Sequence, residues 1–464
     1  MTSDYQERLD YLHNRLNYEW QGMPRGPADL TLGRMRRLLQ RLGDPQAGLP
    51  IIHIAGTKGK GSTAAMMAAV LTAAGVRTGL YCSPHLHHLE ERFTIDGKPA
   101  SAAELVGLVD DVREADERLE LEHPLHGDRR STFFEITTAM GLLHFARRGV
   151  GAVVLEVGMG GRLDSTNVVH PVLSIITSIS FDHTRQLGNT LGLIATEKAG
   201  ILKRGRPAVS GVNSGEAQQS IRRVASQRRC RLHELGTDFE FDVIPPDLPL
   251  THPTPCRVAV RTRRTDWGTF SLPLLGPHQA HNAAVALAGL DVLAEERPSL
   301  AVNCDDVARG FAALKWPARV EILGQRPCLV IDGAHNAASA IALVETLLTC
   351  FPLSRRTLVF GTTREKDLRG QLLALLPLFD EVIATRYLEN PRSMPTETIA
   401  DAGLMLTGQT IRTTDHPAEA LELARRLTAP DSLICVTGSL FLAAEVRAIV
   451  LRHQAVSMIG GGVH

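Results

Sequence analysis

The chain has 464 residues, of which 44% are apolar, and this length predicts about two or three globular domains. Fifty basic residues balance fifty acidic ones, so the net charge gives no reason to expect binding to nucleic acid or to an anionic membrane. Seven scattered cysteines without a C-x-x-C pair argue against a zinc site and are typical of the cytoplasm, where we expect this protein.

The N-terminal segment is charged and has no apolar leader, and no stretch of about 18 residues is continuously apolar. We therefore expect neither a secretion signal nor a membrane span. The expected helices of the first part cover residues 4–20, 29–42, 63–74, 102–121, 133–147, 213–233 and 278–294. The expected strands cover residues 51–55, 76–81, 152–157, 172–178, 258–260 and 267–272. The near-continuous apolar runs at 152–157 and 172–178 are typical of buried parallel strands.

A second strand–helix series begins near residue 320. Its strands are expected in "CLVIDGAHN", "RTLVFGTT", "EVIATR" and "SLICVTGSL", each of which runs from an apolar stretch into a small or polar turn. The sequence therefore predicts an α/β protein with a large N-terminal P-loop ATPase domain over residues 1–310, whose sheet is mostly parallel. A smaller Rossmann-like α/β domain is expected over residues 311–464.

The stretch "GTKGKGST" joins the strand over 51–55 to the following helix. Its glycines allow backbone N–H groups to turn toward an anion at the start of the helix, and Lys58 or Lys60 adds a positive charge. The stretch departs from the strict phosphate-loop pattern, because Gly61 follows Lys60 and the hydroxyl of Ser62 comes one residue late. We favour a phosphate-binding loop over a solvated turn with two surface lysines.

Polar residues follow neighbouring strands at the edge where ligands bind in doubly wound sheets. Ser83 follows the strand over 76–81, Glu156 ends the strand over 152–157, and His183 lies after the strand over 172–178. A hydroxyl, a carboxylate and an imidazole beside a phosphate-binding loop form a plausible Mg²⁺ site. Taken alone, His183 could equally be a half-buried structural histidine.

Three further positions are ambiguous from the residues alone. Lys198 lies in "LGLIATEKAGILK", and spacing favours a surface lysine paired with Glu197 over a buried amine. Asp332 ends a strand and precedes "GAHN", and "VTGSLF" offers a further turn rich in backbone N–H groups. Each of these signals is weak in isolation.

Together the motifs resemble those of folylpolyglutamate synthases and dihydrofolate synthases, the folate branch of the Mur ligase superfamily. The resemblance rests on "GTKGKGST", "SPHL", "EVGMGGRLDSTN", "DHTRQLGNTL", "EKAGI", "HNAAVAL", "WPAR", "DGAHN" and "VTGSL", and it extends over about residues 29–447. It implies a reaction in which ATP phosphorylates a substrate carboxylate. The amine of L-glutamate then displaces phosphate to form an amide.

The resemblance also implies roles for individual residues. The catalytic residues would be Lys60, Lys198 and His335. Nucleotide-binding residues would be Gly59, Lys60, Gly61, Ser62, Asn282, Arg319 and Asp332. Ser83, Glu156 and His183 would bind magnesium, with two ions in all, and Lys198 would be carbamylated, which reverses the interpretation from spacing. The pocket for folate or dihydropteroate would be formed by Leu30, Thr132, Leu163 and Asp164. His335 and Ser439 would lie on the glutamate side.

This sequence departs from the family pattern at Lys58, Glu90, Glu365 and Phe441, and the last removes a hydroxyl near the expected glutamate site. Lys58 has no assigned role, so Lys58→Asn is predicted to be nearly silent. Other possible functions are a Mur-type ligase for another carboxylate, a P-loop ATPase switch, and a non-catalytic binding protein. We expect a monomer that acts on small molecules without nucleic acid or membrane partners.

Overall fold

The computed structural model describes residues 3–21, 31–122, 130–352 and 355–460. The chain divides into two compact units. The first contains Met1–Asp242, Val258–Phe270 and His281–Leu314, and the second contains Val243–Arg257, Ser271–Ala280 and Lys315–His464. The expected domain boundary between residues 310 and 311 remains a prediction.

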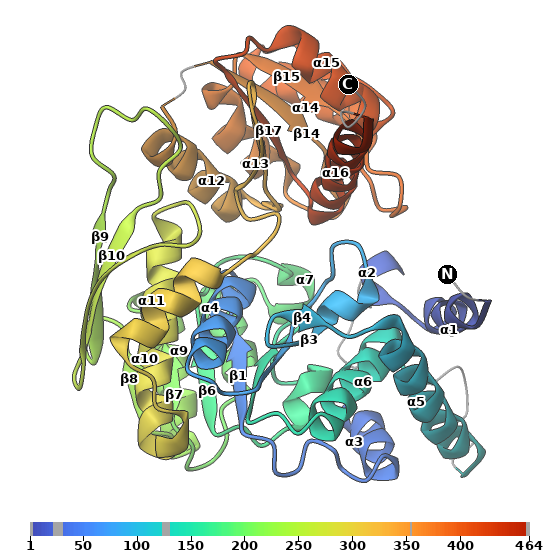
Figure 1. Cartoon of the computed structure of the whole chain (residues 1–464), viewed down its shortest axis with the longest axis vertical. Helices are drawn as coiled ribbons and strands as arrows, with labels where there is room; N and C mark the ends of the chain where they lie inside the picture. Colours follow the sequence, from blue (N-terminus) through green and yellow to red (C-terminus); the bar gives the residue numbers. More distant parts are fainter. Residues whose placement is uncertain (1–2, 22–30, 123–129, 353–354, 461–464) are drawn as a thin grey trace. The chain divides into compact units, whose positions relative to one another are not determined.

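In the described part of the first unit, eight strands form one sheet in the order β4-β3-β2-β5-β1-β6-β7-β8. Figure 1 labels β1, β3, β4, β6, β7 and β8 of this sheet. The strands are β1 (Ile51–Ala55), β2 (Thr78–Tyr81), β3 (Phe93–Ile95), β4 (Lys98–Pro99), β5 (Ala152–Glu156), β6 (Leu173–Ile176), β7 (Ala208–Ser210) and β8 (Leu232–Glu234). From β2 to β8 every neighbouring pair is parallel, whereas β3 and β4 are antiparallel additions at one edge. This confirms the expected parallel-rich sheet.

Helices cover both faces of this sheet. They are α1 (Ser3–His13), α2 (Tyr18–Gln21), α3 (Leu32–Arg41), α4 (Lys60–Ala73), α5 (Ala102–Glu122), α6 (Phe133–Arg147), α7 (Thr184–Leu187), α8 (Leu191–Ala199), α9 (Gly215–Gln227), α10 (His278–Glu296) and α11 (Cys304–Ala313). Short 3-10 helices cover Leu89–Arg92, Ser165–Val168 and Pro298–Leu300.

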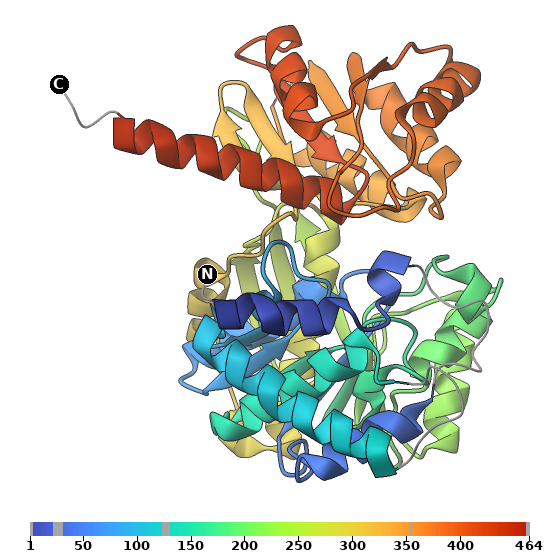
Figure 2. The same ribbon diagram turned by 90° about the vertical axis from the view of Figure 1, so that its right-hand side faces the viewer.

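Alternation of side chains along the strands assigns the helices to the two faces. Val153 and Leu155 belong to a core formed with α3, α5 and α6, and Ile176 belongs to a core formed with α8 and α9. On the other face, Gly289 of α10 lies against Ile175 of β6 and Met67 of α4. Helix α11 packs on α4, and α1 lies along α5 (Figure 2).

A three-stranded sheet, ordered β11-β10-β9, follows β8 in the sequence. Its strands are β9 (Phe239–Ile244), β10 (Arg257–Thr262) and β11 (Asp266–Ser271). The strands expected over 258–260 and 267–272 correspond to the last two. The sequence gave no signal for β9.

The described part of the second unit contains a six-stranded sheet ordered β12-β13-β17-β14-β15-β16. The strands are β12 (Glu321–Gln325), β13 (Cys328–Ile331), β14 (Arg356–Phe360), β15 (Glu381–Ala384), β16 (Arg412–Thr413) and β17 (Leu433–Thr437). Only the β12–β13 pair among these described strands is antiparallel. The helices are α12 (Ala337–Cys350), α13 (Leu368–Leu375), α14 (Thr396–Thr407), α15 (Pro417–Leu427) and α16 (Leu440–Gly460), with a 3-10 helix over Leu376–Leu378. This is the expected Rossmann-like arrangement.

Three expected helices have different limits in the structure. The helix expected over 4–20 is interrupted, because Asn17 caps a separate helix, α2, and its side chain accepts the N–H of Glu19 at 2.9 Å. The helix expected over 213–233 ends at Gln227, before a turn in which Arg229 has φ of 53°. Helix α4 begins at Lys60, three residues earlier than expected, directly after Gly59. Among the described residues, no helix is long and apolar enough to cross a membrane.

Candidate active site

Four neighbouring parallel strands of the first unit bring the expected site residues to one edge. In the order β2-β5-β1-β6, Ser83 follows β2, Glu156 ends β5, the glycine loop follows β1, and residues 177–183 follow β6. The register pairs Ile54 with Glu156 and Ala55 with Ile176. The strand ends are therefore level, and ligands of doubly wound sheets bind outside such carboxyl ends.

The glycine loop places three consecutive residues in the first turn of α4. Gly59 precedes this helix with φ of 79°, a left-handed conformation that glycine adopts without steric cost. The N–H of Thr63 is the one that closes the first turn, onto the carbonyl of Gly59 at 2.8 Å. The N–H groups of Lys60, Gly61 and Ser62 have no acceptor within the helix, so this turn can bind an anion.

Asn282 of α10 lies directly over this turn. A Cβ atom added to Gly59 would collide with the Asn282 amide, so only glycine permits this approach. The hydroxyl of Thr63 also donates to the Asn282 carbonyl at 3.4 Å. The structure thus brings together Gly59 and Asn282, two expected nucleotide-binding residues that are more than 200 positions apart in the sequence.

Glu156 places a buried carboxylate beside the loop. Its Oε1 lies 4.0 Å from the ammonium of Lys60, and its Oε2 accepts the N–H of Ser83 at 3.4 Å. A hard oxygen donor at a sheet edge, next to a serine hydroxyl, suits Mg²⁺, which takes few protein ligands and keeps several waters. In the described part of the chain, no three His, Cys, Asp or Glu side chains gather as a metal cluster.

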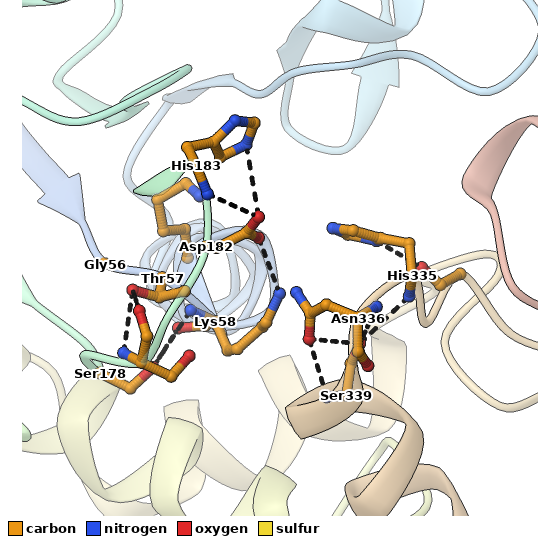
Figure 3. Close-up of polar contacts among 12 residues, drawn as sticks. Gly56, Thr57, Lys58, Ser178, Asp182, His183, His335, Asn336 and Ser339 are labelled. Atoms are coloured by element: carbon orange, nitrogen blue, oxygen red, sulfur yellow. Dashed lines mark hydrogen bonds and ion pairs between the residues drawn. The ribbon is translucent and has the colours of Figure 1, made fainter. Parts of the chain in front are cut away.

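His183 is held by its neighbour Asp182. Its backbone has φ of 49° at the start of α7, its N–H donates to Asp182 Oδ1 at 3.0 Å, and its ring Nε2 lies 3.8 Å from the same oxygen. The other carboxylate oxygen of Asp182 forms an ion pair with the Lys58 ammonium at 3.2 Å (Figure 3). His183 is thus linked to the glycine loop through Asp182.

Lys58 is also fixed through its backbone. Its N–H donates to Ser178 Oγ at 3.1 Å, and its carbonyl accepts the hydroxyls of Thr177 at 2.6 Å and Ser178 at 3.0 Å. The side chain of Lys58 is only 26% exposed and that of Asp182 only 12%. The structure therefore gives Lys58 a role that the sequence did not show, which is to tie the glycine loop to the segment that carries His183.

This contact changes the expectation for Lys58→Asn. Asparagine is too short to keep the ion pair, so we expect turnover to fall about 2- to 5-fold, as for loss of a partly buried ion pair. Steady-state kinetics on Lys58→Asn, Asp182→Asn and the double variant will check this. The two losses should not add, because each change breaks the same contact. Full turnover in Lys58→Asn would support the original expectation.

Lys198 is buried on α8 and donates to the carbonyl of Gly56 at 3.0 Å. Burial, with a smaller contribution from the charge of Lys60, lowers the pKa of Lys198 to about 7. Glu197 instead forms an ion pair with Arg162 at 3.0 Å. The interpretation of Lys198 as a surface lysine paired with Glu197 is therefore wrong. The neutral form of such an amine, here buried beside the glycine loop, is the form that reacts with CO₂.

The residues expected to line the acceptor pocket are tied into local structure. Thr132 caps α6, since it exchanges hydrogen bonds of 2.9–3.2 Å with Glu135, which pairs with Arg34. Asp164 is buried and accepts N–H groups from Met159 at 2.9 Å and Thr166 at 3.0 Å. Leu163, beside it, is half-buried, and Leu30 lies outside the described residues.

In the second unit, Asp332 and His335 share one turn after β13. Asp332 accepts the N–H groups of Val320 at 3.0 Å and Ala334 at 2.8 Å, and burial raises the pKa of Asp332 although the Arg319 guanidinium opposes the shift. His335 contacts the carbonyl of Gly333 through Nδ1 at 2.8 Å, ahead of the α12 cap formed by Asn336 and Ser339 (Figure 3).

Ser439 occupies the matching place after β17. It is buried, and its Oγ accepts the N–H of Phe441 at 3.1 Å at the start of α16. Because β13 and β17 are parallel neighbours, the turns that carry Asp332, His335 and Ser439 lie on the same edge of their sheet.

Comparison with known proteins identifies the fold and the family. Residues 54–290 match the Mur ligase middle domain, and residues 318–440 match the Mur ligase glutamate ligase domain. The chain is 33% identical over 455 residues to a dihydrofolate synthase/folylpolyglutamate synthase of Bacillus subtilis, covering 96% of this chain and 99% of that protein. The chain belongs to the folylpolyglutamate synthase/dihydrofolate synthase family.

The chain is also similar to two further members of this family. A folylpolyglutamate synthase of Mycobacterium tuberculosis, solved with ADP, has a TM-score of 0.86 and 32% identity, and the match covers 97% of this chain and 98% of that one. A probable bifunctional folylpolyglutamate synthase/dihydropteroate synthase of Haloferax volcanii is 36% identical over 417 residues. That match covers 89% of this chain but only 47% of the Haloferax protein. The chain therefore spans about half the length of that relative.

The sequence gave no sign of one aromatic side chain, Tyr387, that lies near the expected glutamate site. Tyr387 packs against Phe441 with ring centroids 5.4 Å apart, and its hydroxyl lies 2.8 Å from Thr363 Oγ1. A tyrosine hydroxyl is thus present close to the position where Phe441 lacks one. No signal in the sequence links these residues, because they come from different strand ends.

Proposed function

We propose that this protein is an ATP- and Mg²⁺-dependent ligase that adds L-glutamate to the carboxylate of a folate, with dihydropteroate as a second acceptor. The observation that carries the proposal is the level edge of β2, β5, β1 and β6. There the first turn of α4, the Lys60 charge, the Glu156 carboxylate and the buried Lys198 amine lie together in a chain of this family.

The reaction has two steps. An oxygen of the acceptor carboxylate attacks the γ-phosphorus of ATP, and ADP leaves with the electron pair of the broken P–O bond. The glutamate amine then attacks the acyl carbon, phosphate leaves, and the amine gives up a proton. Neither step needs a protein nucleophile, so positioning and charge neutralisation supply the catalysis.

The first turn of α4, Gly59–Ser62, would hold the phosphates, and Lys60 would neutralise charge on the transferred phosphoryl group. Ser83, Glu156 and His183 would hold magnesium, which when bound would supply positive charge to offset that of the phosphates. Lys198, as a carbamate, would supply an anion toward a second magnesium ion. Asn282, Arg319 and Asp332 would bind the rest of ATP.

The remaining assignments concern the acceptor and the amino acid. Leu30, Thr132, Leu163 and Asp164 would line the pocket for the folate or dihydropteroate. His335 and Ser439 would bind glutamate or assist its deprotonation. We place these functions in an N-terminal domain over residues 1–310 and a C-terminal domain over residues 311–464 of a monomer.

The test is an assay of purified protein with ATP, Mg²⁺, labelled L-glutamate and either tetrahydrofolate or dihydropteroate. We expect a labelled amide product with each acceptor, together with one ADP per amide bond. A product with another carboxylate but with neither of these would favour a different Mur-type ligase. ATP hydrolysis without any amide would favour a P-loop ATPase switch, and neither activity would favour a binding protein.

A further inference from the structure

Two residues with left-handed backbone flank Arg319 in the second unit. Ala318 has φ of 53° and Val320 has φ of 52°, and both side chains are buried. This region of backbone conformation is unfavourable for any residue with a Cβ atom, and especially for a β-branched one. Such strain persists only where the surroundings determine the backbone, and it is concentrated at functional sites.

Hydrogen bonds hold this turn at three points. The N–H of Val320 donates to Asp332 Oδ2 at 3.0 Å, and the carbonyl of Ala318 accepts the N–H of Gly333 at 3.0 Å. The N–H of Ala318 donates to Glu321 Oε2 at 2.9 Å. Glu321 is therefore the side chain that fixes the first of the two left-handed residues.

Glu321 is itself held by Arg447 on α16. The Arg447 Nε atom lies 3.0 Å from Glu321 Oε1 and 2.9 Å from Oε2, and each of the two side chains is only 19% exposed. A charge-assisted contact at this degree of burial restricts the carboxylate to one orientation. The orientation of Glu321 is therefore set by the helix that begins at the Ser439 turn.

The direction of the Arg319 side chain depends on the same turn. Its Nη1 donates to the Ala318 carbonyl at 2.9 Å, and it lies so close to Gly333 that a Cβ there would approach to 2.8 Å. If Ala318 left the left-handed conformation, its carbonyl would turn away and the guanidinium would lose this contact.

We propose that Glu321, oriented by Arg447, is a positioning residue for Arg319, and that it acts by fixing the left-handed backbone of Ala318. The inference rests on the proposed function for one point, the assignment of Arg319 to nucleotide binding. It assigns to Glu321 and Arg447 a role in nucleotide affinity without contact to the nucleotide.

The test is ADP binding by calorimetry, which needs no turnover. Glu321→Ala is expected to weaken ADP binding about 10-fold, since Arg319 no longer has one preferred direction. Ala318→Gly in the Glu321→Ala protein should restore most of that affinity, because glycine adopts the left-handed conformation without the carboxylate. In steady-state assays the KM for ATP should rise while kcat at saturating ATP stays close to that of the unaltered protein.

Two comparisons separate positioning from a general loss of stability. In an Arg319→Met background, Glu321→Ala should cause no further loss of ADP affinity. Glu381→Gln, which breaks a more exposed Glu–Arg pair with Arg412 in the same sheet, should leave ADP affinity unchanged. If Glu321→Ala fails to fold, Arg447→Met is measured in its place, with the same expected loss and the same rescue.

Equal ADP affinity in the unaltered and Glu321→Ala proteins would overturn the positioning role while leaving the proposed ligase function intact. Failure of Ala318→Gly to rescue, or an additive loss in the Arg319→Met background, would also overturn it. If the unaltered protein did not bind ADP at all, the nucleotide site of the proposed function would fail, and this inference with it.

Discussion

Lys198→Ala is expected to abolish amide formation, with kcat at least about 100-fold lower, while ADP still binds with nearly unchanged affinity. The Nζ atom of Lys198 contacts the carbonyl of Gly56, a residue that precedes in sequence the turn proposed to hold the phosphates. Its loss therefore removes the proposed carbamate without removing the first-turn N–H groups of α4. Single-turnover assays of acyl phosphate and amide formation, beside ADP calorimetry, will measure the two effects separately.

Lys203→Ala is the matched control for this change. Burial also lowers the pKa of a second lysine, Lys203, to about 8. Its ammonium, however, donates to the Asn167 carbonyl at 2.9 Å and to the Asn167 side chain at 2.8 Å. Turnover should therefore survive in Lys203→Ala. Near-normal turnover in Lys198→Ala would remove the carbamate from the mechanism.

The pH dependence gives an independent measurement on the unaltered protein. With a pKa of about 7 for Lys198, the neutral amine dominates above pH 7 and falls about tenfold for each pH unit below it. Only the neutral amine reacts with CO₂, so protein kept in CO₂-depleted buffer at pH 6 should have low activity. Its activity should return slowly after bicarbonate is added. A protein indifferent to bicarbonate at every pH would contradict carbamylation.

Glu156→Gln is expected to lower turnover at least about 100-fold and to raise the Mg²⁺ concentration needed for half-maximal activity. The amide is nearly the same size as the carboxylate, so packing at the end of β5 should be kept, while the negative charge beside Lys60 is lost. Turnover measured across a Mg²⁺ titration, and ADP affinity with and without Mg²⁺, will check this. In Glu156→Gln, Mg²⁺ should no longer raise the affinity for ADP.

Glu234→Gln controls for the loss of a buried carboxylate in the same sheet. Glu234 ends β8, is also buried, and pairs with Arg222 at 2.8 Å, away from β5. It should keep full turnover and normal Mg²⁺ dependence. Turnover of Glu156→Gln within about threefold of the unaltered protein at every Mg²⁺ concentration would exclude Glu156 from the metal site.

The sequence was most informative at the ends of parallel strands. Buried strands show as short apolar runs, and the residue after each run must lie at the carboxyl edge of the sheet. For this reason the sequence predicts that Ser83, Glu156 and the glycine loop lie together, and the strand order places them so. The family resemblance then supplied the reaction, which spacing alone would not have given.

Local patterns were less informative where a side chain competes with the backbone. The expected helix over 4–20 is interrupted because Asn17 caps α2, and helix α4 begins early because Gly59 takes a left-handed conformation. Such endings depend on individual hydrogen bonds and φ values, whereas hydrophobic periodicity reports only that a helix is present.

The sequence by itself determined the fold class, the family and the strand ends that carry the site, since these follow from hydrophobic runs and local motifs. Tertiary structure alone decided the environments of single residues. It buried Lys198 against the Gly56 carbonyl and paired Lys58 with Asp182. It also placed Glu321, which pairs with Arg447, where its carboxylate accepts the N–H of Ala318. Each of these contacts joins residues that sheet order and backbone conformation bring close together. Whether such a residue is charged depends on its burial and not on residue type alone.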